Sequence, residues 1–229
     1  MKVLIIIPAY NEEESIEKVI NNLKQNYSQY DYVIINDGSH DHTSEICHKN
    51  KYKIIDLPVN LGLTGAFQTG LKYAYKKGYD YAIQFDADGQ HLPEYIPAMV
   101  DKIEEGYDMV IGSRFVEKPK PRSLRMLGSR VISTAIKITT GVHIADPTSG
   151  MRLFNKTLIK EFAENINYEP EPDTISFLIK QGAKIGEVQV EMKEREAGES
   201  YLNLSRSIVY MTKMFVSIII LQNFRNRKK

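Results

Sequence analysis

Short apolar runs alternate with amphipathic segments along the first half of the chain. Each run is followed by a polar turn, and the predicted strands lie at residues 3–7, 32–35, 53–57, 81–85 and 109–111. Predicted helices lie between them, at residues 12–26, 41–50, 64–77 and 93–104. Apolar strands that alternate with amphipathic helices are typical of a parallel sheet covered by helices on both faces. The pattern therefore predicts a three-layer α/β fold with a mostly parallel central sheet.

The second half of the chain opens with a basic segment. Residues 118–145 contain no Asp or Glu, and their apolar residues recur at helical spacing, which predicts a basic amphipathic helix. Further strands are predicted at 151–154 and 183–192, with helices between them at 156–164 and 173–181.

A last, hydrophobic helix is predicted near the C-terminus. Its apolar stretch, residues 208–221, is interrupted by Lys213 and followed by a basic tail. The stretch is short for a membrane span and suits a helix that lies in the membrane interface or packs on the domain or on a partner. We therefore expect one domain at 1–201, and a membrane-interface or partner-binding helix with its tail at 202–229.

The charge balance and the single cysteine narrow the class of protein. Thirty Lys and Arg oppose 29 Asp and Glu among 229 residues, so no overall field draws the chain to nucleic acid. Cys47, the one cysteine of the sequence, fits a reducing compartment and is predicted to lie in the core. The apolar run at 3–7 is too short for a signal peptide. These features predict a cytoplasmic protein without a nucleic-acid partner.

Polar residues follow several of the predicted strands. Asp86 and Asp88 come directly after the fourth strand, in a loop where both carboxylates can turn toward one cation. The carboxyl ends of parallel strands meet at one sheet edge, where ligands of open α/β sheets bind. Carboxylate oxygens suit Mg²⁺ or Mn²⁺. The pair also fits an ordinary turn, but its place after a buried strand favours a metal site. The histidines fit no zinc pattern and are interpreted as loop residues: His40, His42, His91 and His143.

Eight short strings, in one order, carry a resemblance to a known family. They are I-I-I-P-A-Y-N-E-E at 5–13, I-I-N-D-G-S-H-D-H-T at 34–43, N-L-G-L-T-G-A-F-Q-T-G at 60–70, Q-F-D-A-D-G-Q-H-L-P-E at 84–94, G-S-R-F at 112–115, D-P-T-S-G-M-R-L-F at 146–154, I-G-E-V-Q-V at 185–190 and R-E-A-G-E-S at 195–200. The chain resembles the inverting glycosyltransferases of family 2, and among them the dolichol-phosphate-mannose-synthase-like branch that glycosylates polyprenyl phosphates. The resemblance implies the GT-A fold, a Rossmann-like nucleotide-binding architecture, for residues 1–201.

The resemblance also implies roles for residues at the matching positions. Residues implied to bind the nucleotide sugar are Pro8, Tyr10, Glu12, Asp37, Asp86, Ala87 and Asp88. Residues implied to hold Mg²⁺ or Mn²⁺ are Asp86, Asp88 and Gln90. Residues implied to bind the acceptor phosphate are Arg114, Arg130, Ser149, Arg195 and Ser200. The residues implied to be catalytic are Asp88, Arg114 and Arg195.

The implied reaction is metal-dependent, inverting transfer of a sugar from a nucleotide sugar, with UDP preferred, to a polyprenyl phosphate. The product is a lipid-monophosphate sugar for modification of a cell-surface glycan. We expect the enzyme to lie on the inner face of the cell membrane, with a small membrane protein or a second copy of the chain as a further partner.

Three alternatives remain open from the sequence. The acceptor could be a sugar hydroxyl of a lipid-linked saccharide, which needs a general base; Glu171 and Asp173 are the candidates. The string F-D-A-D-G at 85–89 is similar to the nucleophile motif of haloacid-dehalogenase-like phosphatases. The chain could also be a non-catalytic subunit of a membrane complex. A lipid phosphate is favoured because it is already anionic and needs no base.

Overall fold

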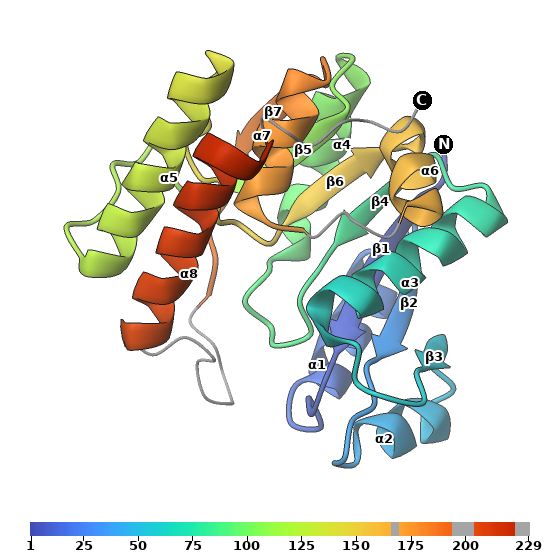
Figure 1. The fold of residues 1–229 in the computed structure, drawn as a ribbon. Helices are drawn as coiled ribbons and strands as arrows, with labels where there is room; N and C mark the ends of the chain where they lie inside the picture. The colour runs from blue at the N-terminus through green and yellow to red at the C-terminus, as the bar shows by residue number, and fades with distance from the viewer. Residues whose placement is uncertain (166–169, 194–203, 223–229) are drawn as a thin grey trace.

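The computed structural model describes residues 1–165, 170–193 and 204–222, with the backbone alone at 124, 125 and 204–208 (Figure 1). Within these residues one seven-stranded sheet has the order β3-β2-β1-β4-β6-β5-β7. The strands are β1 (Val3–Ala9), β2 (Asp31–Asn36), β3 (Ile54–Asp56), β4 (Tyr81–Gln84), β5 (Met109–Ser113), β6 (Arg152–Asn155) and β7 (Ile185–Gln189). The predicted α/β fold with a mostly parallel sheet is confirmed.

Strand direction decides which loops share an edge of the sheet. Strand β1 runs parallel to β2 and β4, β2 runs parallel to β3, and β5 runs parallel to β7. Strand β6 lies antiparallel between β4 and β5, with Ile83 opposite Leu153 and Val110 also opposite Leu153. Because β6 runs the other way, the loop that enters it, residues 146–151, lies at the edge where β4 and β5 end. That edge therefore collects the acidic pair, the segment after β5 and the 146–151 loop.

Helices cover both faces of the sheet. One face carries α1 (Ile16–Asn26), α2 (Thr43–Lys49) and α4 (Ile96–Glu104), which follows the short helix η1 (Pro93–Tyr95). The other face carries α3 (Gly62–Lys77), α5 (Leu124–Thr140), α6 (Lys156–Glu164), α7 (Pro172–Lys180) and α8 (Leu204–Val216), which continues as the π-helix η2 (Ser217–Leu221). Strand β1 contributes alternate residues to both layers, with Ile6 in one core and Ile5 and Ile7 in the other. This double burial explains its unbroken apolar run.

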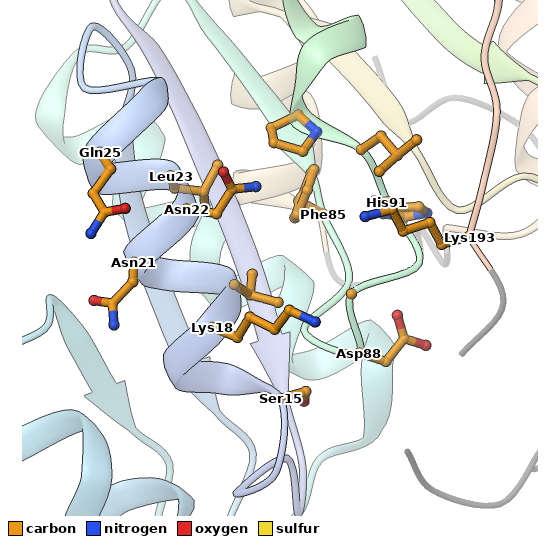
Figure 2. A pocket seen from close by; sticks show the side chains of 14 residues that line it. Ser15, Lys18, Asn21, Asn22, Leu23, Gln25, Phe85, Asp88, His91 and Lys193 are labelled. Carbon is orange, nitrogen blue, oxygen red and sulfur yellow. The ribbon is translucent and has the colours of Figure 1, made fainter. Parts of the chain in front are cut away.

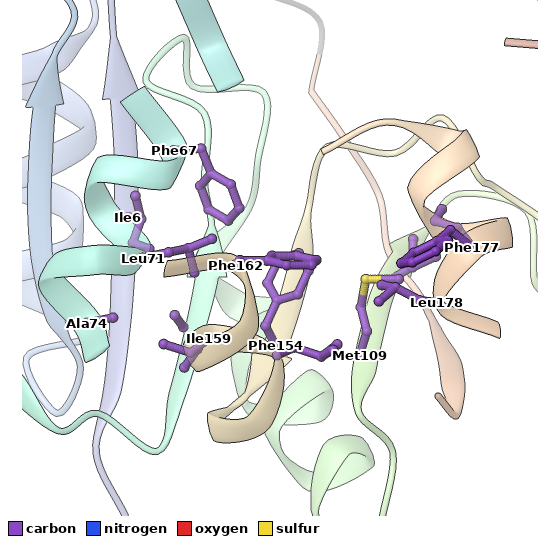
Figure 3. Close-up of a cluster of buried hydrophobic side chains, with 14 of the residues drawn as sticks. Ile6, Phe67, Leu71, Ala74, Met109, Phe154, Ile159, Phe162, Phe177 and Leu178 are labelled. Atoms are coloured by element: carbon purple, nitrogen blue, oxygen red, sulfur yellow. The ribbon is translucent and has the colours of Figure 1, made fainter. Parts of the chain in front are cut away.

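Aromatic packing joins α3 and α6 to the sheet (Figure 3). The ring of Phe154 on β6 lies 5.7 Å from Phe67 of α3 and 5.3 Å from Phe162 of α6. Such tilted and edge-to-face pairs add to the free energy gained by burial. Cys47 is fully buried against the opposite face, as the sequence predicted.

The predicted elements differ from the observed ones mainly at their ends. The first helix begins at Ile16, four residues later than the apolar pattern indicates. The reason is that the amides of Glu12 and Glu13 donate to Thr43 Oγ1 and Asp41 Oδ2, in the loop after β2. Residues 12–15 therefore form a turn that joins two strand ends instead of a first helical turn.

Helix α8 packs against α5 and α7 (Figure 1). Its Met214 and η2 residue Ile218 are buried in the core, whereas Val209 and Ile220 face outward. Gly128 of α5 allows a close approach, because a Cβ atom there would lie 2.7 Å from Met211 Cγ. Among the described residues, no helix is both long enough and apolar enough to cross a membrane. The division at residue 201 and the partner of the outward face remain predictions.

Substitution of Gly70 tests the packing of α3 on the sheet. A Cβ atom at this position would lie 2.2 Å from Ile6 Cγ2, and Ile6 is fully buried and β-branched. We expect Gly70→Ala to lower the free energy of unfolding by about 1–3 kcal/mol, because the core must shift to admit the methyl group. Denaturant unfolding measures the change, with the exposed Lys76→Ala on the same helix as control. Equal stability of Gly70→Ala and wild type would contradict this packing.

Candidate active site

Hydrogen bonds tie the loop after β1 to the loop after β2. Asn11 N–H donates to Ser39 Oγ at 3.0 Å, and His40 N–H donates back to Asn11 Oδ1 at 2.9 Å. Tyr10 lies exposed above this junction, with its ring edge-to-face with His40. The cross-linked loops, with Pro8 at the end of β1 and Glu12 beyond it, form a shelf that holds an aromatic ring and a carboxylate.

Asp37, directly after β2, links the end of that strand to the start of α3. Its carboxylate is buried, and Oδ1 accepts from Leu61 N–H at 2.7 Å, which ties the end of β2 to the start of α3. The neighbouring Gly38 has φ +68°, and a Cβ there would lie 2.8 Å from Asn60 N, so a side chain would be strained and crowded. The residues implied to bind the donor at β1 and β2 therefore lie side by side.

The acidic pair follows β4, and His91 organises its first member. Asp86 N–H donates to His91 Nδ1 at 2.8 Å, so Nδ1 must be the acceptor and the neutral ring carries its proton on Nε2. That Nε2 faces Asp86 Oδ2 at 3.4 Å, and the His91 side chain is only 2% exposed. Gly150 borders the same oxygen, since a Cβ there would lie 3.4 Å from Asp86 Oδ2. The Asp86 side chain itself stays 34% exposed.

Asp88 and Gln90 complete the predicted metal ligands. Asp88 Oδ1 accepts from Gln90 N–H at 3.0 Å. The Gln90 side-chain amide donates to Lys193 O at 3.4 Å, which leaves its amide oxygen as the potential ligand. Ala87, between the two aspartates, is buried in the core. Two carboxylates and an amide oxygen are hard ligands that suit Mg²⁺ or Mn²⁺, so this donor set fits the predicted metal.

A cavity of about 530 Å³ opens beside Asp88, between α1 and the loop after β4 (Figure 2). Ser15, Lys18 and Asn22 line it from α1 and the turn before it, and Lys193 lines it from the other side. Figure 2 shows the Lys18 amine pointing toward the loop that carries Asp88. The cavity offers polar room next to the acidic pair.

Arg114 follows the end of β5 and forms an ion pair with the buried carboxylate of Asp146. Its Nε and Nη2 donate to Asp146 Oδ2 at 2.7 Å and Oδ1 at 3.0 Å. Asp146 is 0% exposed, while the Arg114 side chain is 22% exposed. The pairing takes part of the guanidinium fork, so contact with an acceptor phosphate would use the remaining N–H donors.

Lys120 shares the ring of Phe115 with Arg114, and Arg130 bonds to the Lys120 backbone; we call the three residues Arg114, Lys120 and Arg130 the basic cluster. The ring of Phe115 lies 5.1 Å from Arg114 Cζ and 5.7 Å from Lys120 Nζ. Lys120 Nζ donates to the hydroxyls of two buried α5 serines, Ser129 at 2.9 Å and Ser133 at 3.0 Å. Burial lowers the pKa of the Lys120 ammonium below its ordinary value, and the carboxylates of Asp146 and Glu187 partly oppose this shift. Arg130 Nη2 donates to Lys120 O at 2.6 Å and so holds the loop in place.

Three predicted acceptor residues remain: Ser149, Arg195 and Ser200. Ser149 is buried and donates its hydroxyl proton to Gly112 O at 2.5 Å, so phosphate binding would require this bond to be exchanged. Arg195 and Ser200 lie outside the described residues.

The two candidate bases lie under the C-terminal helix. Tyr210 of α8 donates to Glu171 Oε2. Asp173 Oδ2 accepts from Ser217 Oγ at 2.6 Å and from Gln222 Nε2 at 2.9 Å. Both carboxylates therefore hold α8 and η2 against α7.

Sequence reasoning missed His91 and Lys120 as members of the site. His91 lies in the loop between β4 and η1, as predicted, but its side chain is buried there and orients Asp86. Its place in the string Q-F-D-A-D-G-Q-H-L-P-E was the available signal. Lys120 is one of several cations in the basic segment. Nothing in the sequence indicates that its ammonium donates to the hydroxyls of Ser129 and Ser133.

Comparison with known proteins decides the family. Residues 4–162 match the family described as Glycosyl transferase family 2. The chain belongs to this family. It is therefore a glycosyltransferase, which sets aside the phosphatase and the non-catalytic subunit.

Individual relatives extend the likeness over most of the chain. A UDP-N-acetylglucosamine–dolichyl-phosphate N-acetylglucosaminyltransferase from Methanococcus voltae is 34% identical over 214 residues, 82% of this chain and 84% of the relative. An undecaprenyl-phosphate mannosyltransferase from Micrococcus luteus is 29% identical over 229 residues, 93% of each chain. The solved glucosyl-3-phosphoglycerate synthase from Mycobacterium tuberculosis, in complex with Mn²⁺, UDP and glucosyl-3-phosphoglycerate, has a TM-score of 0.72 at 17% identity and covers 99% of this chain and 81% of its own. This last likeness confirms the predicted GT-A fold.

Replacement of His91 tests whether it orients a metal ligand. We expect His91→Phe to weaken Mn²⁺ binding in the presence of UDP by about 10-fold or more, because Asp86 loses the ring that receives its amide and faces its carboxylate. Titration followed by electron paramagnetic resonance of free Mn²⁺ measures the affinity. His91→Gln, whose amide offers an acceptor and a donor, should recover part of it.

His143 is exposed, so His143→Phe is the control, and this variant should bind Mn²⁺ as tightly as wild type does. Wild-type affinity in a folded His91→Phe would contradict the orienting role.

Proposed function

We propose that this family 2 glycosyltransferase moves one sugar from a nucleotide sugar to a polyprenyl phosphate and inverts the anomeric centre. A UDP-sugar is the preferred donor, and the product is a lipid-monophosphate sugar for modification of a cell-surface glycan. The names of the two relatives from Methanococcus voltae and Micrococcus luteus, with dolichyl and undecaprenyl phosphate, support the acceptor. The Methanococcus voltae name and the UDP bound in the solved neighbour support the nucleotide.

One observation carries the choice of acceptor. The basic cluster lies on the same sheet edge as the acidic pair, whereas Glu171 and Asp173 accept hydrogen bonds from the C-terminal helix. A sugar hydroxyl would need a positioned base, since it is a weak nucleophile at neutral pH. A phosphate monoester is already anionic and needs cations to hold it. The distribution of charge therefore favours a lipid phosphate.

The donor would lie along the shelf formed by the ends of β1, β2 and β4. Tyr10 offers a ring for the base, and the carboxylates of Glu12 and Asp37 accept from base or ribose donors. Asp86, Asp88 and Gln90 would hold Mg²⁺ or Mn²⁺, which neutralises the charge that develops on the leaving diphosphate. His91 keeps Asp86 in one orientation for this contact.

The acceptor phosphate would lie between the acidic pair and the basic cluster. Arg114 and Lys120 would face its oxygens, with Arg130 holding the loop that carries Lys120. An anion bound here would replace the neutral hydroxyls as the partner of Lys120 and offset its cost of burial. We include Arg195 and Ser200 among the phosphate-binding residues on the family resemblance. The phosphate oxygen attacks the anomeric carbon on the face opposite the leaving diphosphate.

The lipid chain implies contact with a membrane, and α5 and α8 are suited to it. Leu127, Val131 and Ile138 of α5 and Val209 and Ile220 of the C-terminal helix are exposed apolar residues. Exposed Lys137 and Lys213 stand nearby on the same helices and suit anionic headgroups. We propose a peripheral enzyme on the cytoplasmic face of the membrane, where a small membrane protein or a second copy of the chain could share this surface.

An Asp88→Asn variant tests the reaction and its metal. A panel of labelled UDP- and GDP-sugars is supplied with Mn²⁺ in detergent, with and without undecaprenyl phosphate. We expect label in the organic phase only when lipid is present, and about 100-fold less with Asp88→Asn, because one metal ligand loses its charge. The exposed Asp101→Asn serves as control. Donor hydrolysis without a lipid product in wild type would contradict the lipid-phosphate acceptor.

Neutral replacements of the two candidate bases test the acceptor class. Glu171→Gln and Asp173→Asn keep an oxygen that can accept from the C-terminal helix. We expect kcat at saturating lipid phosphate to stay within about threefold of wild type, with the charge lost beside Arg152 raising only the KM for the lipid. Loss of a general base would instead lower kcat by about 10²–10⁴-fold. A loss of that size in either variant would favour a sugar-hydroxyl acceptor.

A further inference from the structure

The C-terminal helix is attached to the domain by polar contacts as well as by its apolar face. The Glu171 carboxylate accepts a hydrogen bond from Tyr210, and the Asp173 carboxylate accepts hydrogen bonds from Ser217 and Gln222. We call Glu171 and Asp173 the helix seat. Burial, and then the carboxylate of Glu171, raise the pKa of the Tyr210 hydroxyl, so it remains a proton donor at neutral pH. The helix is therefore oriented by directional bonds.

Arg152 connects the start of α7, which carries the helix seat, to the 146–151 loop. Its side chain, on β6, is buried and donates to three backbone carbonyls: Nε to Ser149 O at 2.9 Å, Nη2 to Pro147 O at 3.0 Å and Nη1 to Glu171 O at 3.4 Å. A guanidinium is planar and its donors have fixed directions. One rigid group therefore sets the position of the 146–151 loop relative to the start of α7.

The 146–151 loop touches both halves of the proposed active site. At one end Asp146 holds the guanidinium of Arg114. At the other end Gly150 borders the Asp86 carboxylate and the ring of His91. A shift of this loop would move Arg114 and would alter the wall beside Asp86.

Charge balance links Arg152 to the seat as well. Burial lowers the pKa of Arg152, and the nearby carboxylates of Glu171, Asp146 and Asp173 oppose this shift. A buried cation that loses its compensating charges becomes strongly destabilising. The orientation of Glu171 by Tyr210 therefore contributes to the placement of Arg152.

We propose that the C-terminal helix positions the acceptor side of the active site through Tyr210, Glu171 and Arg152, so that α8 is part of the catalytic apparatus as well as a surface for lipid. Tyr210 and Arg152 are positioning residues, since they act through the 146–151 loop and through Arg114. The kinetic half of this inference rests on the proposed function, whereas the structural half does not.

Tyr210→Phe tests the coupling, because it keeps the ring and removes only the hydroxyl that reaches Glu171. We expect amide hydrogen exchange of residues 146–152 to become about five- to tenfold faster, since a hydrogen bond to a charged group is lost. We also expect KM for undecaprenyl phosphate to rise about fivefold while the Kd for UDP with Mn²⁺ stays within about twofold. Ser217→Ala, which removes a donor to Asp173, should change both quantities in the same direction.

Tyr52→Phe is the matched control, because its buried hydroxyl donates to Asn21 on the opposite face of the sheet, at 2.8 Å. It should leave exchange at 146–152 and the KM unchanged. Wild-type exchange at 146–152 in a folded Tyr210→Phe would overturn the coupling. Faster exchange with an unchanged KM would overturn the positioning role. If wild type itself transfers no sugar to lipid, the proposed function fails, and the exchange comparison still tests the coupling.

Discussion

The buried pairing of Asp146 with Arg114 is the contact on which the acceptor side of the site depends. A carboxylate with no exposed surface is costly unless donors surround it. Asp146 meets that requirement with Nε and Nη2 of Arg114, the Arg114 amide and the Thr148 hydroxyl. Its own amide and that of Ala145 donate to Glu187 of β7. The loop that enters β6 is therefore joined to the end of β5 and to the middle of β7 by polar and charged contacts as well as by the sheet.

The antiparallel strand β6 explains why this loop can serve two functions. A parallel strand at that place would have begun at the far edge, remote from the ligands. Because β6 begins at the edge where β4 and β5 end, its entry loop lies between Asp86 and Arg114. The donor residues on the Rossmann-like half and the cations on the other half thus meet across one short segment.

The acidic stretch at 170–173 shows how one composition can support different roles. As sequence, Glu171 and Asp173 are two carboxylates at the start of a helix, where a base or a favourable interaction with the helix dipole is equally suitable. In the structure their partners are hydroxyl and amide groups of α8 and η2, far along the chain. Their positions are therefore explained by their bonds to the C-terminal helix, and the same two carboxylates help to compensate the charge of Arg152.

The sequence by itself determined the fold class, the order of strands and helices and the family resemblance, because these follow from local periodicity and from contiguous motifs. The apolar run of β1 had to be buried on both faces, and the D-A-D-G string had to follow a strand. Only the tertiary structure decided what each polar group meets. His91 orients Asp86, the Lys120 ammonium donates to two serine hydroxyls, and Glu171 accepts a hydrogen bond from Tyr210. No local sequence pattern encodes these contacts. The physical reason is that a hydrogen-bond partner is chosen by distance in space, and the tertiary structure brings together residues far apart in the chain, such as Asp173 and Gln222, which are 49 positions apart.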